Sequence, residues 1–342
     1  MDIGIYLAYS PWIALDEQLH LGQRADELGF HSVWVAETWG QDAGVVLGAL
    51  ARTTQNVRLG AAIMQIPARQ PTTTASAIST VDQLSAGRAI LGLGLSGPQV
   101  SEGWYGVPFE APLGRTKEYI EIVRMALARE KVSYDGKHWQ LPAQKGMGLG
   151  KPLRMIGQPV QDRIPIYLGV MGEKTVRQAG MIADGWLPAF YSPQHAESLN
   201  APLLEGIAKA GRSRADVTIA PTVPVAMADT EAAARDLLRP ILTFYFGAMG
   251  AKGKNFYVDL ATRYGLGDVA TACQDAFLSG DRFRAAASLT PEVIDLASIA
   301  ATPDTLGDKL AAYVDCGVDT LIALPFGDRP RLLEALATAL TA

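Results

Sequence analysis

The sequence lacks the residue clusters from which metal and disulfide sites are built. It has two cysteines, Cys273 and Cys316, which lie far apart and form no C-x-x-C pair. No H-E-x-x-H pair occurs, and the four histidines are scattered at His20, His31, His138 and His195. Neither a metal site nor a disulfide framework is expected, because both need ligands or partners at characteristic spacings.

Long apolar runs and basic blocks are also missing. No continuous apolar stretch approaches the roughly 20 residues that a membrane-spanning helix needs. The net charge is −5, and Lys and Arg are dispersed, which disfavours a nucleic-acid surface. The chain enters an apolar run directly after Asp2, without a basic leader. We therefore expect a cytoplasmic protein that acts on small molecules, away from membranes and nucleic acids.

What the sequence does contain is a regular alternation of strand-like and helix-like segments. Short apolar runs predict strands at Ile3–Leu7, His31–Ala36, Val57–Ile66, Arg88–Leu95, Ile164–Val170, Gly185–Pro188, Val217–Met227 and Thr320–Leu324. Amphipathic segments predict helices at Ala14–Leu28, Asp42–Thr54, Pro71–Leu84, Thr116–Arg129, Lys174–Ala183, Pro193–Lys209, Glu231–Phe246, Thr305–Cys316 and Arg329–Leu340. The class is α/β, and eight units predict a single (β/α)8 TIM barrel over residues 1–342.

Two segments break this rhythm and are predicted to be insertions. After the fourth strand, Val132–Leu141 contains the hairpin signal Asp135-Gly136, and the Gly/Pro-rich segment Gln144–Pro159 leaves the barrel. After the seventh strand, Ala248–Ser288 reads as irregular and partly helical. The barrel is therefore expected to carry insertions after strands four and seven.

The stretch Arg88–Gly106 is rich in glycine and contains the pattern G-x-G-x-x-G at Gly92, Gly94 and Gly97. A dinucleotide-binding turn would need a helix that starts at these glycines. Pro98 instead predicts an irregular loop, and the pattern follows the fourth strand, not the first. We interpret it as a strand end without side chains, against which a flat ligand can lie.

The carboxyl ends of the strands carry aromatic and small residues with few converging charges. In TIM barrels these ends form the active site. The composition favours a flat, partly apolar cofactor over a sugar or a metal ion. The substrate pocket is predicted to have aromatic walls, contributed by Trp39, Trp104, Phe190 and Tyr191.

Four motifs resemble those of the bacterial luciferase-like superfamily, in particular its branch that uses the deazaflavin coenzyme F420. They are L-G-F-x-S-V-W-V-A-E (Leu28–Glu37), L-G-A-A-I-M-Q-I-P-A-R (Leu59–Arg69), G-R-A-I-L-G-L-G-L-S-G-P-Q-V-S-E-G-W (Gly87–Trp104) and A-D-G-W-L-P (Ala183–Pro188). Their order and their positions at strand ends extend the resemblance over nearly the whole chain. It implies a barrel enzyme that moves a hydride between coenzyme F420 (8-hydroxy-5-deazaflavin) and an organic substrate.

The resemblance also implies which residues contact the cofactor. It places a cis peptide between Ala62 and Ile63 against the deazaflavin ring. Between the fifth strand and its helix, free N–H groups could bind the phosphate of the cofactor, with charge added by Lys174; G-E-K-T differs from the G-K-[ST] of a P-loop. The expected cofactor contacts are Glu37, Thr38, Ala62, Ile63, Met64, Gly94, Ser96, Gly97, Pro98, Gln99, Gly169, Val170, Met171, Gly172, Glu173 and Lys174.

The sequence departs from its relatives at the acid–base positions. Several relatives have a His after the acid of the second strand, where this chain has Thr38. Some reductases have a Glu where this chain has Tyr6, and some have a Glu where Gly97 stands. The remaining candidates for a proton donor are Tyr6, Glu102 and water, although a phenol with a pKa of about 10 is a weak donor at neutral pH.

Three functions remain open from the sequence. The first is an F420-dependent oxidoreductase that reduces a C=C or C=N bond of a small organic molecule. The second is a flavin mononucleotide (FMN) dependent luciferase-like monooxygenase, which would use oxygen. The third is a non-catalytic barrel that binds the cofactor. A homodimer is left open for each of them.

Overall fold

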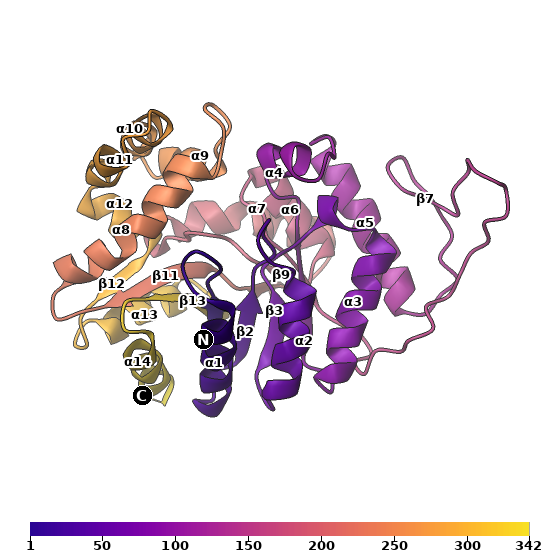
Figure 1. The fold of residues 1–342 in the computed structure, drawn as a ribbon, viewed down its shortest axis with the longest axis horizontal. Helices are drawn as coiled ribbons and strands as arrows, with labels where there is room; N and C mark the ends of the chain where they lie inside the picture. Colours follow the sequence, from indigo (N-terminus) through magenta and orange to yellow (C-terminus); the bar gives the residue numbers. More distant parts are fainter. Residues whose placement is uncertain (342) are drawn as a thin grey trace.

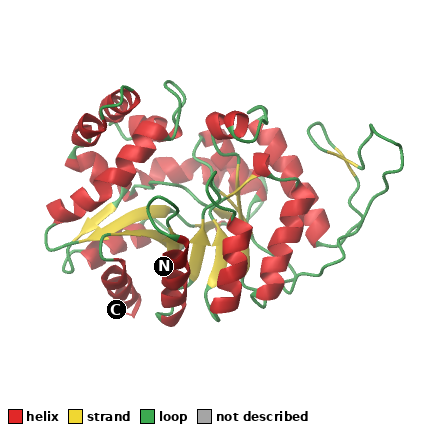
Figure 2. Ribbon diagram, in the orientation of Figure 1, coloured by secondary structure: helices red, strands yellow, loops and turns green. Residues whose placement is uncertain are grey.

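The computed structural model describes residues 1–341, and at its centre lies a parallel sheet (Figures 1 and 2). The strands of this sheet are β1 (Asp2–Leu7), β2 (Ser32–Val35), β3 (Arg58–Ala61), β4 (Met64–Gln65), β5 (Ala89–Gly94), β8 (Ile166–Leu168), β9 (Gly185–Trp186), β10 (Thr218–Ile219), β11 (Thr222–Met227), β12 (Ile299–Ala301) and β13 (Thr320–Phe326). Their order is β10-β9-β8-β5-β3-β2-β1-β13-β11-β12, with β4 paired to β5.

This order closes the sheet into a barrel. β10 and β11 are consecutive pieces of one segment, separated only by Ala220 and Pro221. On one side the N–H of Ala220 donates to the carbonyl of Trp186 at 2.9 Å, next to β9. On the other side the N–H of Ile322 donates to the carbonyl of Pro221 at 2.8 Å, within β13. The predicted barrel is therefore confirmed.

Helices surround the sheet and bury its outer face (Figure 2). They are α1 (Leu15–Glu27), α2 (Ala43–Thr53), α3 (Pro71–Leu84), α4 (Pro98–Gly103), α5 (Pro112–Leu127), α6 (Glu173–Ile182), α7 (Ala196–Lys209), α8 (Glu231–Ala248), α9 (Phe256–Arg263), α10 (Gly267–Leu278), α11 (Arg282–Ser288), α12 (Pro291–Ala297), α13 (Leu306–Asp315) and α14 (Arg329–Thr341), with 3-10 turns η1 (Ile66–Ala68), η2 (Pro193–His195) and η3 (Arg214–Asp216). Because both faces are covered, the strands read as continuous apolar runs. None of the described helices is long and apolar enough to cross a membrane.

Large aromatic side chains fill the barrel interior where the strands carry glycine. The Trp34 indole lies over Gly60, where a Cβ atom would come within 2.2 Å of the ring. Tyr167 lies over Gly185 in the same way, and the Trp34 and Tyr167 ring centroids are 5.8 Å apart. The indole N–H of Trp34 donates to the Ser32 hydroxyl at 2.8 Å. Side chains therefore fill the middle of the barrel, and open space is left at the carboxyl ends of the strands.

The insertion after β5 projects away from the barrel at the right of Figure 1. It begins with an antiparallel hairpin, β6 (Tyr134–Asp135) and β7 (Gln140–Leu141), as the Asp-Gly signal predicts. The Glu118 carboxylate on α5 holds the hairpin in place. It accepts hydrogen bonds from the backbone N–H groups of Lys137, His138 and Trp139 at 2.8–3.0 Å. The segment that follows, residues 142–160, is called the arm below. It exposes five large apolar side chains, those of Met147, Leu149, Leu153, Ile156 and Val160.

Several element boundaries differ from the sequence-based prediction. The segment Val57–Ile66 is two strands, β3 and β4, interrupted at the cis peptide Ala62–Ile63. The segment Val217–Met227 is also divided, because Pro221 offers no N–H to the sheet. Pro98 was expected to open an irregular loop, yet it begins α4, since proline is compatible with the first position of a helix.

Some smaller predictions need correction as well. The segment Ala248–Ser288 was expected to be irregular and partly helical, and most of it forms α9, α10 and α11. Helix α12 and strand β12 were not predicted at all. Helix α5 begins at Pro112, earlier than expected, and α7 begins at Ala196 after the turn η2.

Candidate active site

A cavity of about 740 Å³ opens at the carboxyl ends of the barrel strands. Its wall is built from residues at or after the ends of β1, β2, β3, β5, β8 and β9, together with parts of β4, β11, β13, α4, α8 and α9. The size is ordinary for a site that holds a drug-sized organic ligand. Of the described residues that line it, Glu37 is the only one with an ionisable carboxylate, and none is Lys, Arg or His.

The floor of the cavity is formed where β3, β5 and β8 approach each other closely. A Cβ atom on Gly92 would lie 1.8 Å from the Ala61 carbonyl oxygen, and one on Gly94 would lie 2.2 Å from Cδ1 of Ile63. Glycine is therefore required at Gly92, where the clash is with backbone, whereas a side chain at Gly94 would displace Ile63. The peptide between Ala62 and Ile63 is cis, as the resemblance implied, and both residues line the cavity.

The turn from β8 into α6 forms one corner of the cavity. Gly169, Val170, Met171 and Gly172 line it, and Gly172 is the N-cap of α6 without a side-chain hydrogen bond. The first N–H groups of a helix have no intrahelical acceptor and attract anions. The turn is held by the Trp186 indole N–H, which donates to the Val170 carbonyl at 2.8 Å. This corner can therefore bind a phosphate group.

Next to the cavity, Glu37 is held in a buried ion pair. Nη2 of Arg69 lies 2.7 Å from Oε2 of Glu37 and 2.5 Å from Oδ2 of Asp42. The Glu37 carboxylate also accepts the Gln65 backbone N–H at 3.2 Å. Asp42 caps α2 by accepting the Val45 N–H at 3.0 Å. The ion pair therefore joins the end of β2 to α2 and to the segment after β4.

An aromatic cluster forms the opposite wall. Phe190 packs edge-on against Tyr245 and Tyr257, with ring centroids 5.0 and 5.4 Å away. The hydroxyls of Tyr9 and Tyr245 are 3.2 Å apart. Burial, and then the proximity of Tyr9 and Tyr257, raise the pKa of Tyr6 well above its ordinary value. All of these phenols are therefore protonated at neutral pH.

Most predicted site residues line this cavity. They are Tyr6, Glu37, Thr38, Trp39, Ala62, Ile63, Ser96, Gly97, Gln99, Trp104, Gly169, Val170, Met171, Gly172 and Phe190. The indoles of Trp39 and Trp104 are 45% and 62% exposed, which places them at the rim. Glu37 reaches the cavity wall, but its carboxylate is already paired with Arg69.

Seven predicted residues are not among those that line the cavity, and their roles in binding or catalysis stay predictions. They are Met64, Gly94, Pro98, Glu102, Glu173, Lys174 and Tyr191. Tyr191 is fully buried in the core, where its ring packs against Trp186 and its hydroxyl donates to Asn200 at 3.2 Å. The Glu102 carboxylate accepts the Phe109 backbone N–H at 3.1 Å. Glu173 and Lys174 are exposed on the first turn of α6, whereas Met64 and Gly94 are buried strand residues behind the floor.

Sequence reasoning missed several residues of the site. Tyr245, Phe256 and Tyr257 come from α8 and α9, in and beside the segment that was expected to be irregular and partly helical. The concentration of aromatic residues at 244–246 and 256–257 was the available signal. Arg69 was part of a quoted motif, but no local pattern showed that it pairs with Glu37. Among the described residues, no group of three His, Cys, Asp or Glu side chains could hold a metal ion.

Comparison with known proteins places this geometry in context. The chain is 44% identical over 329 residues to a protein of Mycobacterium tuberculosis named as a coenzyme F420-dependent oxidoreductase, with 94% of each chain covered. It is 30% identical to a 5,10-methylenetetrahydromethanopterin reductase of Archaeoglobus fulgidus, covering 87% of this chain and 86% of that protein.

A solved structure shares the fold. It is the coenzyme F420 dependent tetrahydromethanopterin reductase from Methanopyrus kandleri, with a TM-score of 0.86, 24% identity and coverage of 99% of this chain and 97% of that one. A family model described as luciferase-like monooxygenase matches residues 1–320. On this match and on the 44% identity to a full-length relative, the chain belongs to the luciferase-like monooxygenase family.

Proposed function

We propose that this protein is an oxidoreductase that transfers a hydride between coenzyme F420 and an organic substrate, and that it reduces a C=C or C=N bond. The observation that carries the proposal is the glycine-floored, tyrosine-walled cavity of about 740 Å³ at the carboxyl ends of the strands. A relative named as a coenzyme F420-dependent oxidoreductase supports the cofactor, and a relative named as a reductase supports reduction of the substrate.

The residues of the cavity fit a deazaflavin. The floor at Ala62 and Ile63 carries no polar side chain and suits one face of a flat ring. Oε1 of Gln65 is a buried acceptor without a partner in the described chain, and it suits the imide N–H of such a ring. Gly172 at the start of α6 suits the phosphate. When bound, the deazaflavin supplies a hydride donor or acceptor that avoids oxygen chemistry.

Side chains of the protein bind the substrate and supply the proton that it gains on reduction. The hydroxyls of Tyr6 and Tyr257 line the cavity, and neither has a hydrogen-bond partner among the described residues. Their raised pKa values keep both hydroxyls protonated at neutral pH. Each can donate a hydrogen bond to the substrate heteroatom that gains negative charge during reduction. Tyr6 is the proposed proton donor, and Tyr257 joins it as a second candidate.

The substrate is expected to be an unsaturated, mainly apolar molecule. Aromatic walls bury large areas and stack on flat groups. A phosphorylated sugar is disfavoured, because its charge would lose water without meeting a Lys or Arg in this cavity. The exposed indoles of Trp39 and Trp104 at the rim extend the apolar surface toward solvent.

Anaerobic turnover with reduced coenzyme F420 tests the proposal. Enones, imines and a phosphorylated sugar are offered separately, and oxidation of the coenzyme is followed by absorbance. We expect turnover of an enone or an imine. Turnover of the sugar alone would contradict the substrate class.

The role of the phenols is tested on whichever substrate is accepted. Tyr6→Phe should lower kcat by about 10²-fold, as expected for loss of a general acid. Tyr257→Phe tests the second donor, and Tyr264→Phe, whose hydroxyl donates to the Phe190 carbonyl at 3.0 Å, is a matched control. Full activity of both Tyr6→Phe and Tyr257→Phe would mean that the proton comes from water.

The FMN-dependent monooxygenase remains the second candidate, because it is the activity in the family's name. Oxygen uptake with reduced FMN distinguishes the two chemistries. We expect none above the rate of free reduced FMN, and substrate-dependent uptake would favour the monooxygenase.

A further inference from the structure

Phe190 has a backbone conformation that aromatic residues seldom adopt. Its φ is +50°, in the left-handed region, where a bulky side chain is an outlier. Five described non-glycine residues have a positive φ, and three of them, Ala86, Ala111 and Arg129, lie at the ends of α3 and α5, where the chain changes direction. Ser96 and Phe190 instead line the cavity of about 740 Å³. Strained backbone that is maintained in the wall of a cavity points to a function.

The left-handed conformation decides which way the Phe190 ring points. Leu187 and Ala189 line the cavity at the two-residue spacing of an extended chain, and Ala189 is still paired with Thr222. Side chains of an extended chain alternate between two faces, so the next residue would point away from the cavity. The positive φ reverses this direction, and Phe190 joins Ala189 in the wall. The strain therefore places one additional ring in the cavity.

The neighbouring chain holds Phe190 in this conformation. Its backbone N–H donates to the Thr222 carbonyl at 3.2 Å. The next residue, Tyr191, is anchored in the core, where its hydroxyl donates to Asn200 at 3.2 Å. The backbone at Phe190 is thus fixed on both sides, and withdrawal of its ring would disturb one of these contacts.

Behind Phe190 the packing is entirely aromatic. Its ring stacks on that of Phe246, a buried residue of α8, with centroids 6.2 Å apart and an interplanar angle of 26°. Tyr245 and Tyr257 flank it edge-on. Removal of the Phe190 ring would leave a space walled by these three side chains and open to the cavity. An apolar space of this kind accepts an aromatic group, so Phe190 closes one apolar end of the cavity.

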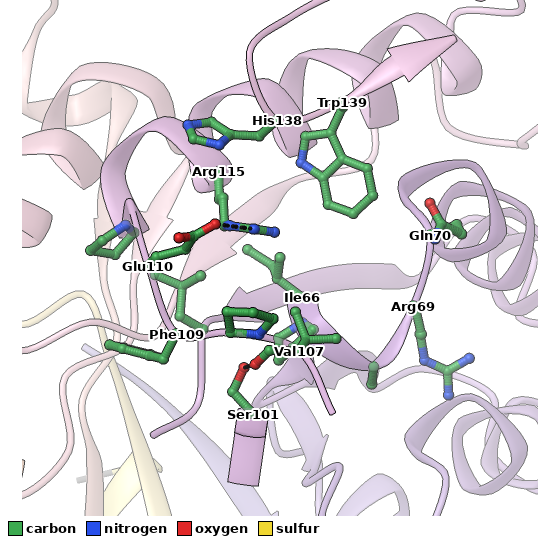
Figure 3. A pocket seen from close by; sticks show the side chains of 15 residues that line it. Ile66, Arg69, Gln70, Ser101, Val107, Phe109, Glu110, Arg115, His138 and Trp139 are labelled. Atoms are coloured by element: carbon green, nitrogen blue, oxygen red, sulfur yellow. Dashed lines mark hydrogen bonds and ion pairs between the residues drawn. The ribbon is translucent and has the colours of Figure 1, made fainter. Parts of the chain in front are cut away.

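Another side of the cavity does not suit an apolar substituent. A second cavity, of about 340 Å³, adjoins it there, and Phe109 lines both. The second cavity contains an ion pair, in which Nη2 of Arg115 lies 3.0 Å from Oε1 of Glu110 (Figure 3). An apolar group would take water from these charges without replacing the lost hydrogen bonds. Within the barrel, an apolar extension of the substrate is therefore favoured only toward Phe190.

We propose that Phe190 is a specificity-determining residue, whose left-handed backbone turns its ring into the cavity and thereby limits the substrate to a compact unsaturated molecule. The substrate part of this statement rests on the proposed reductase function. A small residue at position 190 opens an aromatic subsite for a substrate that carries an additional phenyl group.

Ligand binding to the protein saturated with oxidised coenzyme F420 tests the size limit. Cyclohexanone and 4-phenylcyclohexanone, which resemble the products of enone reduction, are titrated by calorimetry. Phe190→Ala should bind the phenyl derivative at least tenfold more tightly than the wild type does, with less than a threefold change for cyclohexanone. Phe283→Ala, on α11 and 87% exposed outside the cavity, is the matched control and should keep both wild-type affinities.

Thermal unfolding tests the role of the backbone. Phe190→Gly and Phe190→Ala remove the same ring, but glycine adopts a positive φ without strain and alanine does not. We expect the higher Tm for Phe190→Gly. At Val45, an exposed position within α2, the order should be the reverse, because glycine is unfavourable inside a helix. A lower Tm for Phe190→Gly than for Phe190→Ala would overturn the inference that strain orients the ring.

The outcomes separate this inference from the proposed function. Turnover of cyclohex-2-enone by the wild type, together with an unchanged ratio of the two ketone affinities in Phe190→Ala and Phe190→Gly, would overturn the role of Phe190 and leave the reductase standing. A changed ratio without turnover of any enone or imine would contradict the reductase and support the size limit. The same titrations without coenzyme give the ratio if the coenzyme does not bind. Failure of both ketones to bind the wild type and the variants would overturn the inference.

Discussion

At the scale of single residues, the ion pair of Arg69 with Glu37 and Asp42 is the main electrostatic feature beside the cavity. The side chains of Glu37 and Arg69 are 3% and 16% exposed, so little solvent screens them. Removing one partner of such a pair leaves the other buried and incompletely compensated. The pair therefore acts as a fixed support for the β2 and β4 ends of the cavity.

Glu37→Gln should lower the free energy of unfolding by about 3 kcal/mol, the usual cost of breaking a buried pair. Urea denaturation measures this change. Glu27→Gln is the control, because its pair with Arg24 is exposed on α1 and should cost less than about 1 kcal/mol. Equal effects of the two substitutions would show that the Glu37 pair does not stabilise the fold.

The buried tyrosines give a second prediction at this scale. Desolvation and the neighbouring phenols raise the pKa of Tyr6 and Tyr245 well above the ordinary 10.0. The folded state therefore holds these protons more tightly than the unfolded state does. Their contribution to stability is fully present below pH 10 and is lost as the pH rises above it.

We expect Tyr6 and Tyr245 to ionise only together with alkaline unfolding. Tyrosinate absorbance is compared between the wild type and the Tyr6→Phe and Tyr245→Phe variants as the pH is raised, with circular dichroism as the measure of folding. A tyrosinate signal from either residue near pH 10 in the folded protein would contradict the burial described above.

Residue positions could be predicted where the sequence fixes them locally. Gly172 reaches the cavity because it follows a strand, and strand ends are visible as apolar runs. The place of Ile63 was predicted from the resemblance to the luciferase-like superfamily. Arg69 and Tyr257 could not be predicted, because their roles depend on partners far away in the chain. Tyr191 was misplaced because the direction of a side chain after a short strand is decided by packing.

At the scale of elements, the N-terminus of α6 is the proposed phosphate corner. Gly172→Val adds a side chain there. The Cβ would be 3.4 Å from Oγ1 of Thr175, and the φ of Gly172 is −79°, so the fold accepts the change. We expect at least tenfold weaker cofactor binding with an unchanged melting temperature.

Gly307→Val on α13 is the control for this substitution, because a Cβ there meets nothing within 4 Å and Gly307 does not line the cavity. Fluorescence titration with coenzyme F420 measures both variants. Normal affinity in Gly172→Val would place the phosphate elsewhere in the cavity.

Helices and strands could be predicted where a regular apolar period is bounded by a recognisable start or stop residue. Helix α3 spans Pro71–Leu84 as expected, since proline opens it. The breaks between β3 and β4 and between β10 and β11 have no signal in apolar periodicity, because both halves of each segment are buried. The segment of α9 to α11 was predicted only as irregular and partly helical, without helix bounds, because short helices that pack on another helix need little amphipathic length.

At the scale of the whole molecule, the arm is the feature that the barrel does not explain. Met147 and Ile156 are 88% and 95% exposed, and Leu149, Leu153 and Val160 accompany them. Exposed apolar groups of this extent mark interaction surfaces. The homodimer left open by the sequence would cover the arm with a second copy of this chain.

We therefore expect a dimer in sedimentation velocity and a shift toward monomer in the double variant Met147→Glu/Ile156→Glu. Val45→Glu on α2, which is 72% exposed outside the arm, is the control and should remain dimeric. A monomeric wild type, or a double variant that stays dimeric, would contradict a dimer formed through the arm.

The central claim is that this barrel is built for a deazaflavin, and equilibrium titration of the purified protein with coenzyme F420 and with FMN tests it most directly. The account predicts that coenzyme F420 binds more tightly than FMN and that Gly172→Val weakens its binding. Equal affinities, or tighter binding of FMN, would contradict the account.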